Sequence, residues 1–346
     1  MKAVKKVIKS AYKHAPLSFQ NKLFNLVTGN NNRLQKLIDS MMLLCTPISN
    51  REIQKHILKC HLYKVEFEIA SFCNRTCYFC PNSHIDRKST SVELDEAVFL
   101  KILDNLAEIE YDKELSFHRF NEPLANKELI LKRVKQARQK LPKAKLDIFT
   151  NGDYVSKEYL QELKDAGVNW VLMSYYPMQK DFDRTQIIKA MQKMQQKLGL
   201  ESKLVRDTEQ EYRICFIMEG MEIYYRSWNP NAMGSSRGGS VDSMKKSQLI
   251  TESGCFHSAM SFYVDYNGLV MPCCNTRSDE KKHKPFILGD CKKQDMFEIF
   301  FSPVCVNLRR DLFVSTASSC NENIRTICAD CDQDYRWKAA FLSSLQ

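Results

Sequence analysis

The chain lacks the features of a membrane-spanning or secreted protein. No apolar run among its 346 residues approaches the roughly 18 residues that a transmembrane helix needs. No N-terminal apolar block ends in a small-residue cleavage site. Its 44% apolar and 27% charged residues also exclude a disordered chain. We therefore expect a globular cytoplasmic protein of two or three domains, or one α/β barrel with an appendage.

Acidic residues are missing from the N-terminal segment. Residues 1–38 contain no Asp or Glu, but seven Lys and one Arg, out of a net charge of +10 for the chain. In residues 4–15, apolar side chains recur at helical spacing opposite the lysines. We expect residues 1–62 to form a basic helical extension that packs on the main domain or lies peripherally on an anionic membrane. A nucleic-acid partner is not expected.

From residue 63 the pattern alternates between strands and helices. Strands are expected at 64–70, 114–118, 145–150, 170–174, 212–217 and 222–227, and helices at 92–108, 127–140, 156–166 and 184–198. This alternation predicts an α/β fold with a parallel sheet. Residues 63–228 are too few for a full eightfold barrel, so the pattern predicts a partial (β/α)6 TIM-like barrel.

A change of composition marks a second module. Residues 229–240 are rich in Gly and Ser and have no periodicity, which is typical of a domain boundary. The last hundred residues hold eight of the fourteen cysteines, and their one low-complexity tract is a charged loop at 277–284. We expect residues 229–346 to form a linker and a small cysteine-rich module that binds metal.

A first group of cysteines follows the first expected strand. Cys73, Cys77 and Cys80 stand in the sequence CNRTCYFC. A structural zinc site normally takes four ligands, and three thiolates in one loop do not complete a tetrahedron. Three cysteines suit a [4Fe-4S] cluster that leaves one iron open to another ligand.

This motif resembles the signature of radical S-adenosylmethionine (AdoMet) enzymes, also called radical SAM enzymes. The CxxxCxxC spacing follows an opening strand, and Phe79 supplies the aromatic residue that often precedes the last cysteine. The resemblance implies a [4Fe-4S] cluster whose open iron binds AdoMet. It also implies reductive cleavage of AdoMet to a 5′-deoxyadenosyl radical, which takes a hydrogen atom from the substrate.

The resemblance extends to residues after the next strands, where barrel sites lie. Glu122 in HRFNEP occupies the place of a family Gly-Gly-Glu-Pro stretch, although Phe120 and Asn121 replace the glycines. Asn151 follows the third strand, and Ser174 ends the fourth. By this resemblance, the residues expected to bind AdoMet are Phe79, Glu122, Asn151 and Ser174.

A second group of cysteines is expected around a hairpin. Cys255 precedes one strand, an Asn267-Gly268 turn follows, and a second strand leads to Cys273. Such a turn folds two strands back on each other, which brings Cys255 near Cys273. Together with the C-x-x-C pair Cys328 and Cys331, they give four thiolates, enough for one fully ligated site.

This spacing resembles the Twitch and SPASM modules that follow many radical AdoMet barrels. A full SPASM module carries two clusters and needs cysteines beyond the C-x-x-C, which this chain lacks after Cys331. The resemblance implies one auxiliary [4Fe-4S] cluster held by Cys255, Cys273, Cys328 and Cys331. A zinc site is the alternative, and Cys291 or Cys320 could replace one ligand. Cys45, Cys60 and Cys215 are expected to be buried as small hydrophobic residues.

Position alone identifies further candidates. His118 and Arg119 follow the second strand, Tyr175 follows the fourth, and Arg226 ends a late strand. His118, Tyr175 and Arg226 are the candidates for catalytic proton handling. Arg119 and Arg226 are candidate ligands for an anion.

Three functions remain open on the sequence. The first is dehydrogenation of an alcohol carbon in a carbohydrate- or aminocyclitol-like substrate, with the auxiliary cluster taking the second electron. The second is a peptide (RiPP) maturase or an epimerase, in which a thiol such as Cys274 returns a hydrogen atom. The third is a noncatalytic metal-binding protein. The expected partners are a small substrate, or a peptide, and an acidic electron donor such as flavodoxin or ferredoxin.

Overall fold

The computed structural model describes residues 43–176, 182–244, 255, 257–314, 327–328 and 331. The expected helices before residue 43 lie outside these residues. Helix α4 (Arg51–His61) is the first described helix, and the Asn50 side chain caps it by accepting the backbone N–H of Ile53. None of the helices in these ranges is both long enough and apolar enough to span a bilayer.

The described strands form one sheet in the order β10-β9-β8-β1-β2-β3-β4-β7-β6-β5. Six adjacent strands are parallel: β8 (Ser261–Val264), β1 (Lys64–Phe67), β2 (Glu114–Ser116), β3 (Lys145–Thr150), β4 (Trp170–Ser174) and β7 (Glu222–Trp228). The edges are antiparallel and consist of β5 (Ser202–Asp207), β6 (Glu211–Phe216), β9 (Leu269–Met271) and β10 (Gly289–Asp290). The sheet is therefore an open, partial barrel.

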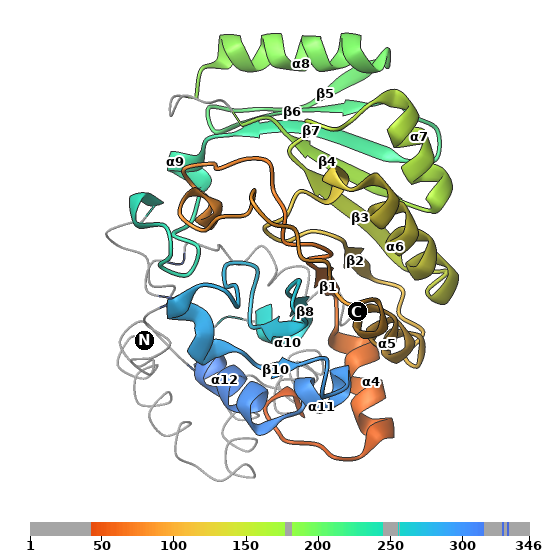
Figure 1. The fold of residues 1–346 in the computed structure, drawn as a ribbon, viewed down its shortest axis with the longest axis vertical. Helices are drawn as coiled ribbons and strands as arrows, with labels where there is room; N and C mark the ends of the chain where they lie inside the picture. The colour runs from red at the N-terminus through yellow and green to blue at the C-terminus, as the bar shows by residue number, and fades with distance from the viewer. Residues whose placement is uncertain are drawn as a thin grey trace, which may run out of the picture.

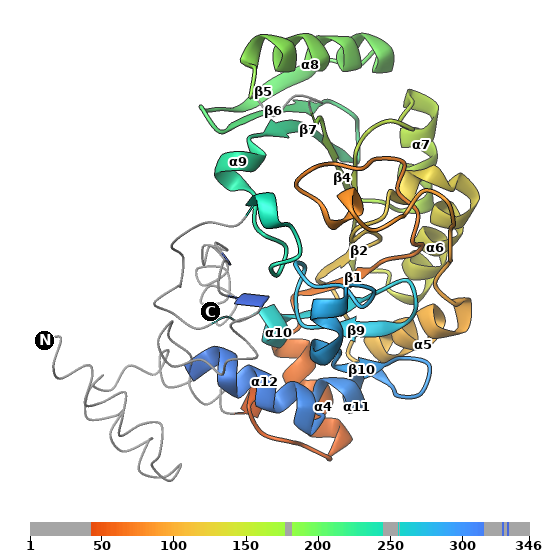
Figure 2. The ribbon, with the colours of Figure 1, turned by 60° about the vertical axis from the view of Figure 1, so that its left-hand side comes forward.

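Three crossover helices cover one face of this sheet, as Figures 1 and 2 show. They are α5 (Glu96–Ala107), α6 (Lys127–Lys140) and α7 (Lys157–Ala166), while α8 (Arg184–Leu198) packs on β6. The other helices that follow α4 are α9 (Pro230–Met233), α10 (His257–Met260), α11 (Met296–Phe300), α12 (Pro303–Val314), η1 (Pro81–Ser83), η2 (Pro123–Ala125), η3 (Asp242–Met244) and η4 (Lys281–Phe286). α11 packs against α4, α5 and α12.

Element boundaries follow the local capping chemistry. α5 begins at Glu96, four residues later than expected, because the Asp95 side chain accepts the N–H groups of Ala97 and Val98. α7 ends as expected at Gly167, whose φ of 112° lies in the left-handed region that glycine tolerates.

The partial barrel is confirmed, but the expectation that β6 belongs to its parallel strands is wrong. β6 is antiparallel to β7, because only residues 217–221 separate them and a parallel crossover takes a dozen residues or more. The sixth parallel strand is instead β8, which pairs with β1 from far along the chain. The proposed division at 62/63 and 228/229 stays a prediction.

The two faces of the parallel strands differ in polarity. Alternate residues such as Phe67, Ile148 and Val171 are fully buried in the main hydrophobic core with the crossover helices. The intervening residues include buried polar side chains, and the Asp147 carboxylate accepts the Ser116 hydroxyl at 2.6 Å. Burial raises the pKa of Asp147 to about 7. Polar chemistry therefore gathers on the face opposite the helices.

Candidate active site

The first cysteine group lies in the loop that follows β1. Cys73, Cys77 and Cys80 are all half-buried. Burial raises the pKa of Cys73 to about 11 and that of Cys77 to about 12, and in each case the charge of Cys80 adds to the shift. The three thiols are therefore close enough to interact electrostatically, in a place that disfavours thiolates without a compensating cation.

The donor set of three thiols in this loop suits an iron–sulfur cluster. Among the described residues, no three His, Cys, Asp or Glu side chains converge so as to hold one metal ion. In a four-iron cluster each thiolate binds a different iron, so the sulfurs need not converge on one point. The cationic irons would offset the burial of the three thiolates. The residues present thus fit a [4Fe-4S] cluster with one open iron.

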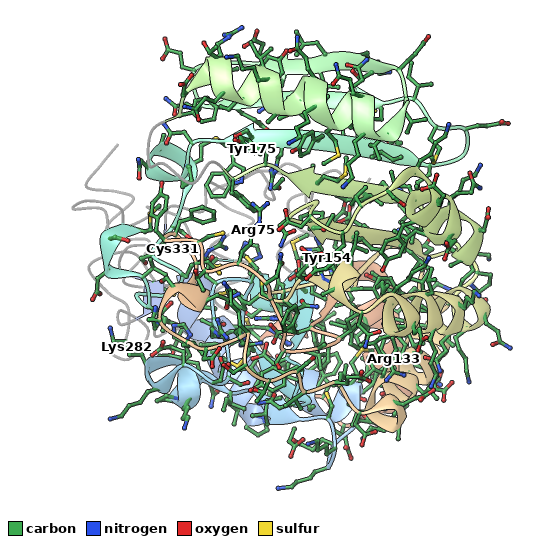
Figure 3. The ribbon with its side chains drawn as sticks, turned by 45° about the horizontal axis from the view of Figure 1, so that its top comes forward. Arg75, Arg133, Tyr154, Tyr175, Lys282 and Cys331 are labelled. Carbon is green, nitrogen blue, oxygen red and sulfur yellow. The ribbon has the colours of Figure 1, made fainter. Side chains whose placement is uncertain are left out.

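The cysteine loop is tied to the loop that follows β3. The Asn151 side chain donates to the Asn74 side chain at 2.8 Å, and Asn74 and Arg75 both bind the Asp153 carboxylate at 2.8 Å. Figure 3 shows Arg75 together with Tyr154 and Tyr175, from the loops after β1, β3 and β4. The structure therefore brings Asn151 to the cysteine loop, as a shared site requires.

Glu122 is buried where these loops meet. Its carboxylate accepts the Thr150 hydroxyl at 2.6 Å, the Asn151 N–H at 2.7 Å and the Leu124 N–H at 3.0 Å. Burial raises the pKa of Glu122 to about 7, against the opposing effect of these hydrogen bonds. Its backbone N–H donates to the Phe72 carbonyl at 2.8 Å. Glu122 thus positions the loops, while its contact with AdoMet stays a prediction.

The residues that replace the family glycines brace the same region. The Phe120 N–H donates to Glu68, and the Asn121 side-chain oxygen accepts the Arg119 N–H at 2.9 Å. The Asn121 amide nitrogen is buried and has no partner in the described ranges. A cavity of about 400 Å³ lies beside it, lined in part by Asn121, Glu122 and Tyr154. An amide N–H group of Asn121 without a hydrogen-bond partner therefore lies next to Glu122.

An aromatic wall stands beside the first cysteine group. The Phe79 ring lies 5.0 Å from Tyr176 and 5.3 Å from Trp228, measured between centroids. Cys77 and Cys80 pack against this cluster. Phe79 is nearly fully buried, so its aromatic neighbours exclude water from this side of the loop.

Ser174 and Arg226 meet at the ends of β4 and β7. The Arg226 Nε donates to the Ser174 hydroxyl at 3.4 Å, and the Tyr175 N–H donates to the Arg226 carbonyl at 2.8 Å. Burial lowers the pKa of Arg226, and no carboxylate in the described ranges forms an ion pair with it. A half-buried guanidinium with no carboxylate of the described residues in direct contact suits a bound anion or a ligand hydroxyl.

A second arginine near Arg226 escaped the sequence analysis. Arg237 lies among the electrostatic neighbours of Arg226 and Tyr176, and its buried Nε has no partner in the part of the chain described. Its backbone has a φ of 51°, which non-glycine residues rarely adopt. The only signal was an Arg inside a Gly- and Ser-rich tract, which the composition assigned to a linker.

His118 and Arg119 are already engaged by the protein. The His118 Nδ1 accepts the Phe149 N–H at 3.2 Å, and burial lowers the pKa of His118 well below its usual value. This geometry favours a positioning role for the imidazole, and its catalytic role stays a prediction. Arg119 pairs with the buried carboxylate of Asp265 at 2.9 Å. Asp265 therefore already compensates the positive charge of Arg119, which the sequence offered as a ligand for an anion.

The second cysteine group gathers around the expected hairpin. Cys255 and Cys273 flank the β8–β9 pair, and the nearby charges that raise the pKa of Cys255, after burial, include those of Cys273 and Cys331. Cys328 packs in the same small apolar cluster as Cys255. The structure therefore gathers the four expected ligands of the second site in one region.

The remaining cysteines differ in burial and in their neighbours. Cys274 lies near the charges of Glu66 and Arg119, toward the polar face of the sheet. Cys291 is fully buried in the main core, no cysteine is among its electrostatic neighbours, and Cys320 lies outside the described residues. Cys215 is buried as expected and Cys45 half-buried. The expectation for Cys60 is wrong, because it lies on an exposed face of α4.

Comparisons with known proteins agree with this geometry. Residues 67–184 match the Radical SAM superfamily, and residues 255–332 match SPASM, an iron–sulfur cluster-binding domain. An S-adenosyl-L-methionine-dependent 2-deoxy-scyllo-inosamine dehydrogenase of Niallia circulans is 36% identical over 112 residues, which are 32% of this chain and 44% of that enzyme. The match therefore spans less than half the length of this relative.

Two solved structures share the fold. BtrN in complex with AdoMet and 2-DOIA superposes with a TM-score of 0.56 at 21% identity, over 79% of this chain and 93% of that one. An open conformation of BtrN gives 0.51 at 19% identity, over 79% and 92%. Both likenesses extend beyond the barrel into the C-terminal module.

Proposed function

The chain is a radical AdoMet protein with a C-terminal SPASM-type domain, and we propose that it oxidises an alcohol carbon to a carbonyl. The substrate class that we propose is carbohydrate- or aminocyclitol-like, as for the dehydrogenase that matches about a third of the chain. The observation that carries the proposal is the second group of cysteines, joined to the end of β2 through Arg119. The Arg119 guanidinium donates to the Cys273 carbonyl at 3.4 Å.

The cofactors divide the chemistry between two places. When bound, AdoMet and the [4Fe-4S] cluster at Cys73, Cys77 and Cys80 supply a hydrogen-abstracting radical, and the auxiliary cluster supplies an acceptor for the second electron. The substrate thus loses one hydrogen atom, one proton and one electron, and its C–O bond becomes C=O. The protein must then bind the polyol, keep water out and accept the proton.

Residues on the polar face suit these tasks. Ser174 and Arg226 present a hydroxyl and a guanidinium for hydroxyl or anionic groups. Tyr175, half-buried at the end of β4, is proposed to relay the released proton through its hydroxyl to solvent, and His118 holds the β3 backbone at Phe149 in place. The aromatic wall around Phe79 excludes water near the cysteine loop.

A radical epimerase or a peptide maturase is the second candidate. Cys274 favours it, because a thiol close to Glu66 and Arg119 could return a hydrogen atom to a substrate radical. No such donor is needed for dehydrogenation.

Product mass separates the two candidates. The protein would be reconstituted anaerobically with iron and sulfide and incubated with AdoMet, dithionite and candidate polyols. Dehydrogenation predicts a product two mass units lighter than its substrate. A product of unchanged mass in H2O that becomes one mass unit heavier in D2O would instead establish epimerisation and refute the proposal.

The basic N-terminal residues support a proposal on partners. Because residues 1–38 are strongly basic, we propose that they contact an anionic membrane peripherally, from the cytoplasm. The electron donor that we propose is an acidic flavodoxin or ferredoxin. Each basic residue near an anionic bilayer contributes about 1 kcal/mol. Salt-sensitive sedimentation with anionic vesicles is therefore expected. If the protein sedimented equally with anionic and neutral vesicles, the proposal would be wrong, and residues 1–38 would be left with packing on the main domain as their role.

A further inference from the structure

The turn that carries Cys273 places a hydroxyl group beside a cysteine sulfur. Cys273 comes shortly after β9, and the chain turns back because the backbone N–H of Thr276 donates to the Cys273 carbonyl at 3.2 Å. The Thr276 hydroxyl oxygen lies 3.7 Å from the Cys273 sulfur and 3.0 Å from the Cys273 carbonyl oxygen. Thr276 is fully buried, so water does not compete for this hydroxyl. One hydroxyl therefore has two acceptors within reach.

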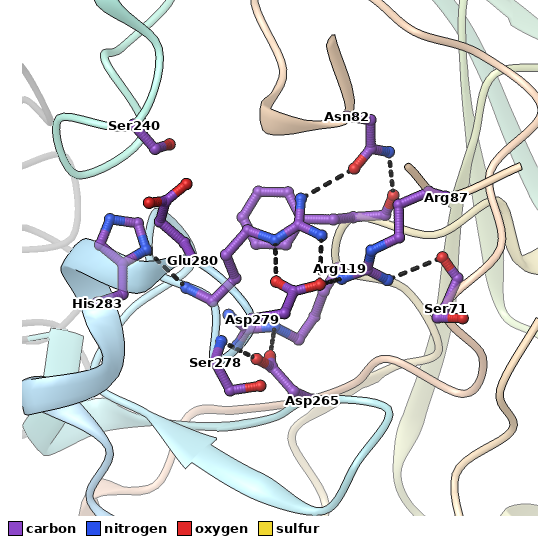
Figure 4. Close-up of polar contacts among 12 residues, drawn as sticks. Ser71, Asn82, Arg87, Arg119, Ser240, Asp265, Ser278, Asp279, Glu280 and His283 are labelled. Atoms are coloured by element: carbon purple, nitrogen blue, oxygen red, sulfur yellow. Dashed lines mark hydrogen bonds and ion pairs between the residues drawn. The ribbon is translucent and has the colours of Figure 1, made fainter. Parts of the chain in front are cut away.

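Arg119 holds the carbonyl groups of this turn. Its guanidinium comes from the end of β2, and Nη2 donates to the Thr276 carbonyl and, at 3.4 Å, to the Cys273 carbonyl. The Nε atom pairs with the Asp265 carboxylate at 2.9 Å, and the Arg119 side chain is only 1% exposed. Figure 4 shows Arg119 and the backbone of Ser278 meeting at this carboxylate. The guanidinium is therefore fixed against the turn.

The Cys273 carbonyl oxygen has more donors than it can accept. A carbonyl oxygen has two lone pairs. Three groups contact this one, which are the Thr276 N–H, the Thr276 hydroxyl and the Arg119 guanidinium. The two nitrogen donors are fixed, one by the backbone turn and the other by the ion pair with Asp265. The hydroxyl hydrogen rotates about its C–O bond, so it is the donor that can change its acceptor.

Ligation of iron by Cys273 decides which acceptor the hydroxyl uses. In a free thiol the sulfur is both a weak donor and a weak acceptor, so either atom of the Thr276–Cys273 pair can donate. A cysteine that ligates iron is a thiolate, which has no proton to give. Its sulfur carries negative charge, and a hydrogen bond to a charged acceptor is stronger than one to a neutral carbonyl. With the cluster bound, the hydroxyl therefore donates to the sulfur.

We infer that Thr276 raises the reduction potential of the auxiliary cluster through this O–H···S hydrogen bond, and that Arg119 directs the hydroxyl to the sulfur by occupying the carbonyl. An added electron makes the cluster more negative, and a hydrogen bond to a ligand sulfur stabilises that reduced form. A higher potential favours transfer of the second electron from the substrate. The inference rests on the proposed function, because Cys273 is a ligand only if the second group of cysteines holds an auxiliary cluster.

The test is an EPR-monitored redox titration of the reconstituted holoenzyme. The signal that does not change when AdoMet is added reports the auxiliary cluster, and it should be the one signal left when Cys73, Cys77 and Cys80 are replaced by alanine. Thr276→Val exchanges the hydroxyl for a methyl group of similar size. It is expected to shift the midpoint potential of this signal to a more negative value. Thr276→Ser keeps a hydroxyl and is expected to retain the original midpoint.

Ser278→Ala is the matched control. Ser278 is also buried and lies in the same loop, but its hydroxyl accepts the Asn267 side-chain amide at 2.9 Å and contacts no cysteine among the described residues. Its removal is expected to leave the midpoint nearly unchanged. Equal shifts in Ser278→Ala and Thr276→Val would overturn the inference, because any change in the loop would then move the potential. An unchanged midpoint in Thr276→Val with full iron content would also overturn it.

A further variant tests the role of Arg119. Arg119→Lys keeps the positive charge beside Asp265 but lacks the planar fork that binds two carbonyls together. The Cys273 carbonyl then competes for the Thr276 hydroxyl, so the midpoint is expected to shift in the same direction as in Thr276→Val. The double variant is expected to shift no further than Thr276→Val alone, because both changes act through one hydroxyl. Additive shifts would contradict the inference.

A smaller substitution guards against loss of assembly. If Thr276→Val fails to bind iron at the second site, Thr276→Ala removes the same hydroxyl without filling its place. The same negative shift is expected, and an unchanged midpoint in Thr276→Ala would refute the inference. If every cluster signal of the unmodified protein responded to AdoMet, the proposed function would fail instead, because no auxiliary cluster would be present to accept an electron.

Discussion

Replacing Cys73, Cys77 and Cys80 together by alanine is expected to reduce formation of 5′-deoxyadenosine to the level seen without protein. Without these thiolates, no iron is available to bind AdoMet or to donate the electron that cleaves it. Liquid chromatography of anaerobic reactions with AdoMet and dithionite measures the nucleoside directly. The loss of 5′-deoxyadenosine should be complete, because AdoMet cleavage itself depends on the first cluster.

Iron analysis is the control for this triple variant. Two four-iron clusters give about eight iron atoms in the unmodified protein, and the variant should keep about four. Replacing Cys45 and Cys60 by alanine offers a matched control, since neither is a predicted ligand, and it should preserve both iron and cleavage. Persistent cleavage in the triple variant would show that the motif is assigned wrongly. Stoichiometric zinc with only four iron atoms would make the second site structural.

Replacing Cys328 and Cys331 together by alanine is expected to abolish the oxidised product while AdoMet cleavage continues. The radical step needs only the first cluster, but completing the oxidation needs an acceptor for the second electron. Measuring 5′-deoxyadenosine and product in the same reaction separates the two steps. The ratio of product to nucleoside should therefore collapse.

The interpretation of this double variant requires that the first cluster survives. Its AdoMet-responsive EPR signal should match that of the unmodified protein, and the iron content should fall to about four. Oxidised product formed at the original ratio would exclude the second site as the electron acceptor. Product with solvent deuterium in both proteins would favour the epimerase.

The sequence was sufficient where the fold depends on local signals. Side-chain caps begin α6, α7 and α8, left-handed glycines end α7 and α8, and the bounds of all three agree with the periodicity to within a residue. The hairpin around Asn267 and Gly268 was equally local, and it brings the second group of cysteines together. Predictions of this kind need only neighbouring residues.

Long-range contacts were beyond the sequence. Nothing local indicates that β8 pairs with β1, or that Arg277 leaves a charged tract to bind Asn82 in the core. A composition argument assigns charged residues to solvent, because an unpaired buried charge is costly. Arg277 reverses that expectation because its partners come from a loop nearly 200 residues earlier and from Asp279.

The pairing of β1 with β8 also has a consequence during synthesis. Val65 lies beside Phe262, so one edge of β1 has no partner until the ribosome has added almost 200 more residues. At about 5–20 residues per second, that wait lasts roughly 10 to 40 seconds. During this interval a strand that is fully buried in the finished protein can pair with another nascent chain. Shielding of this strand by a chaperone would therefore affect the yield of folded protein more than shielding of the edge strand β5, whose side chains are mostly exposed in the finished protein.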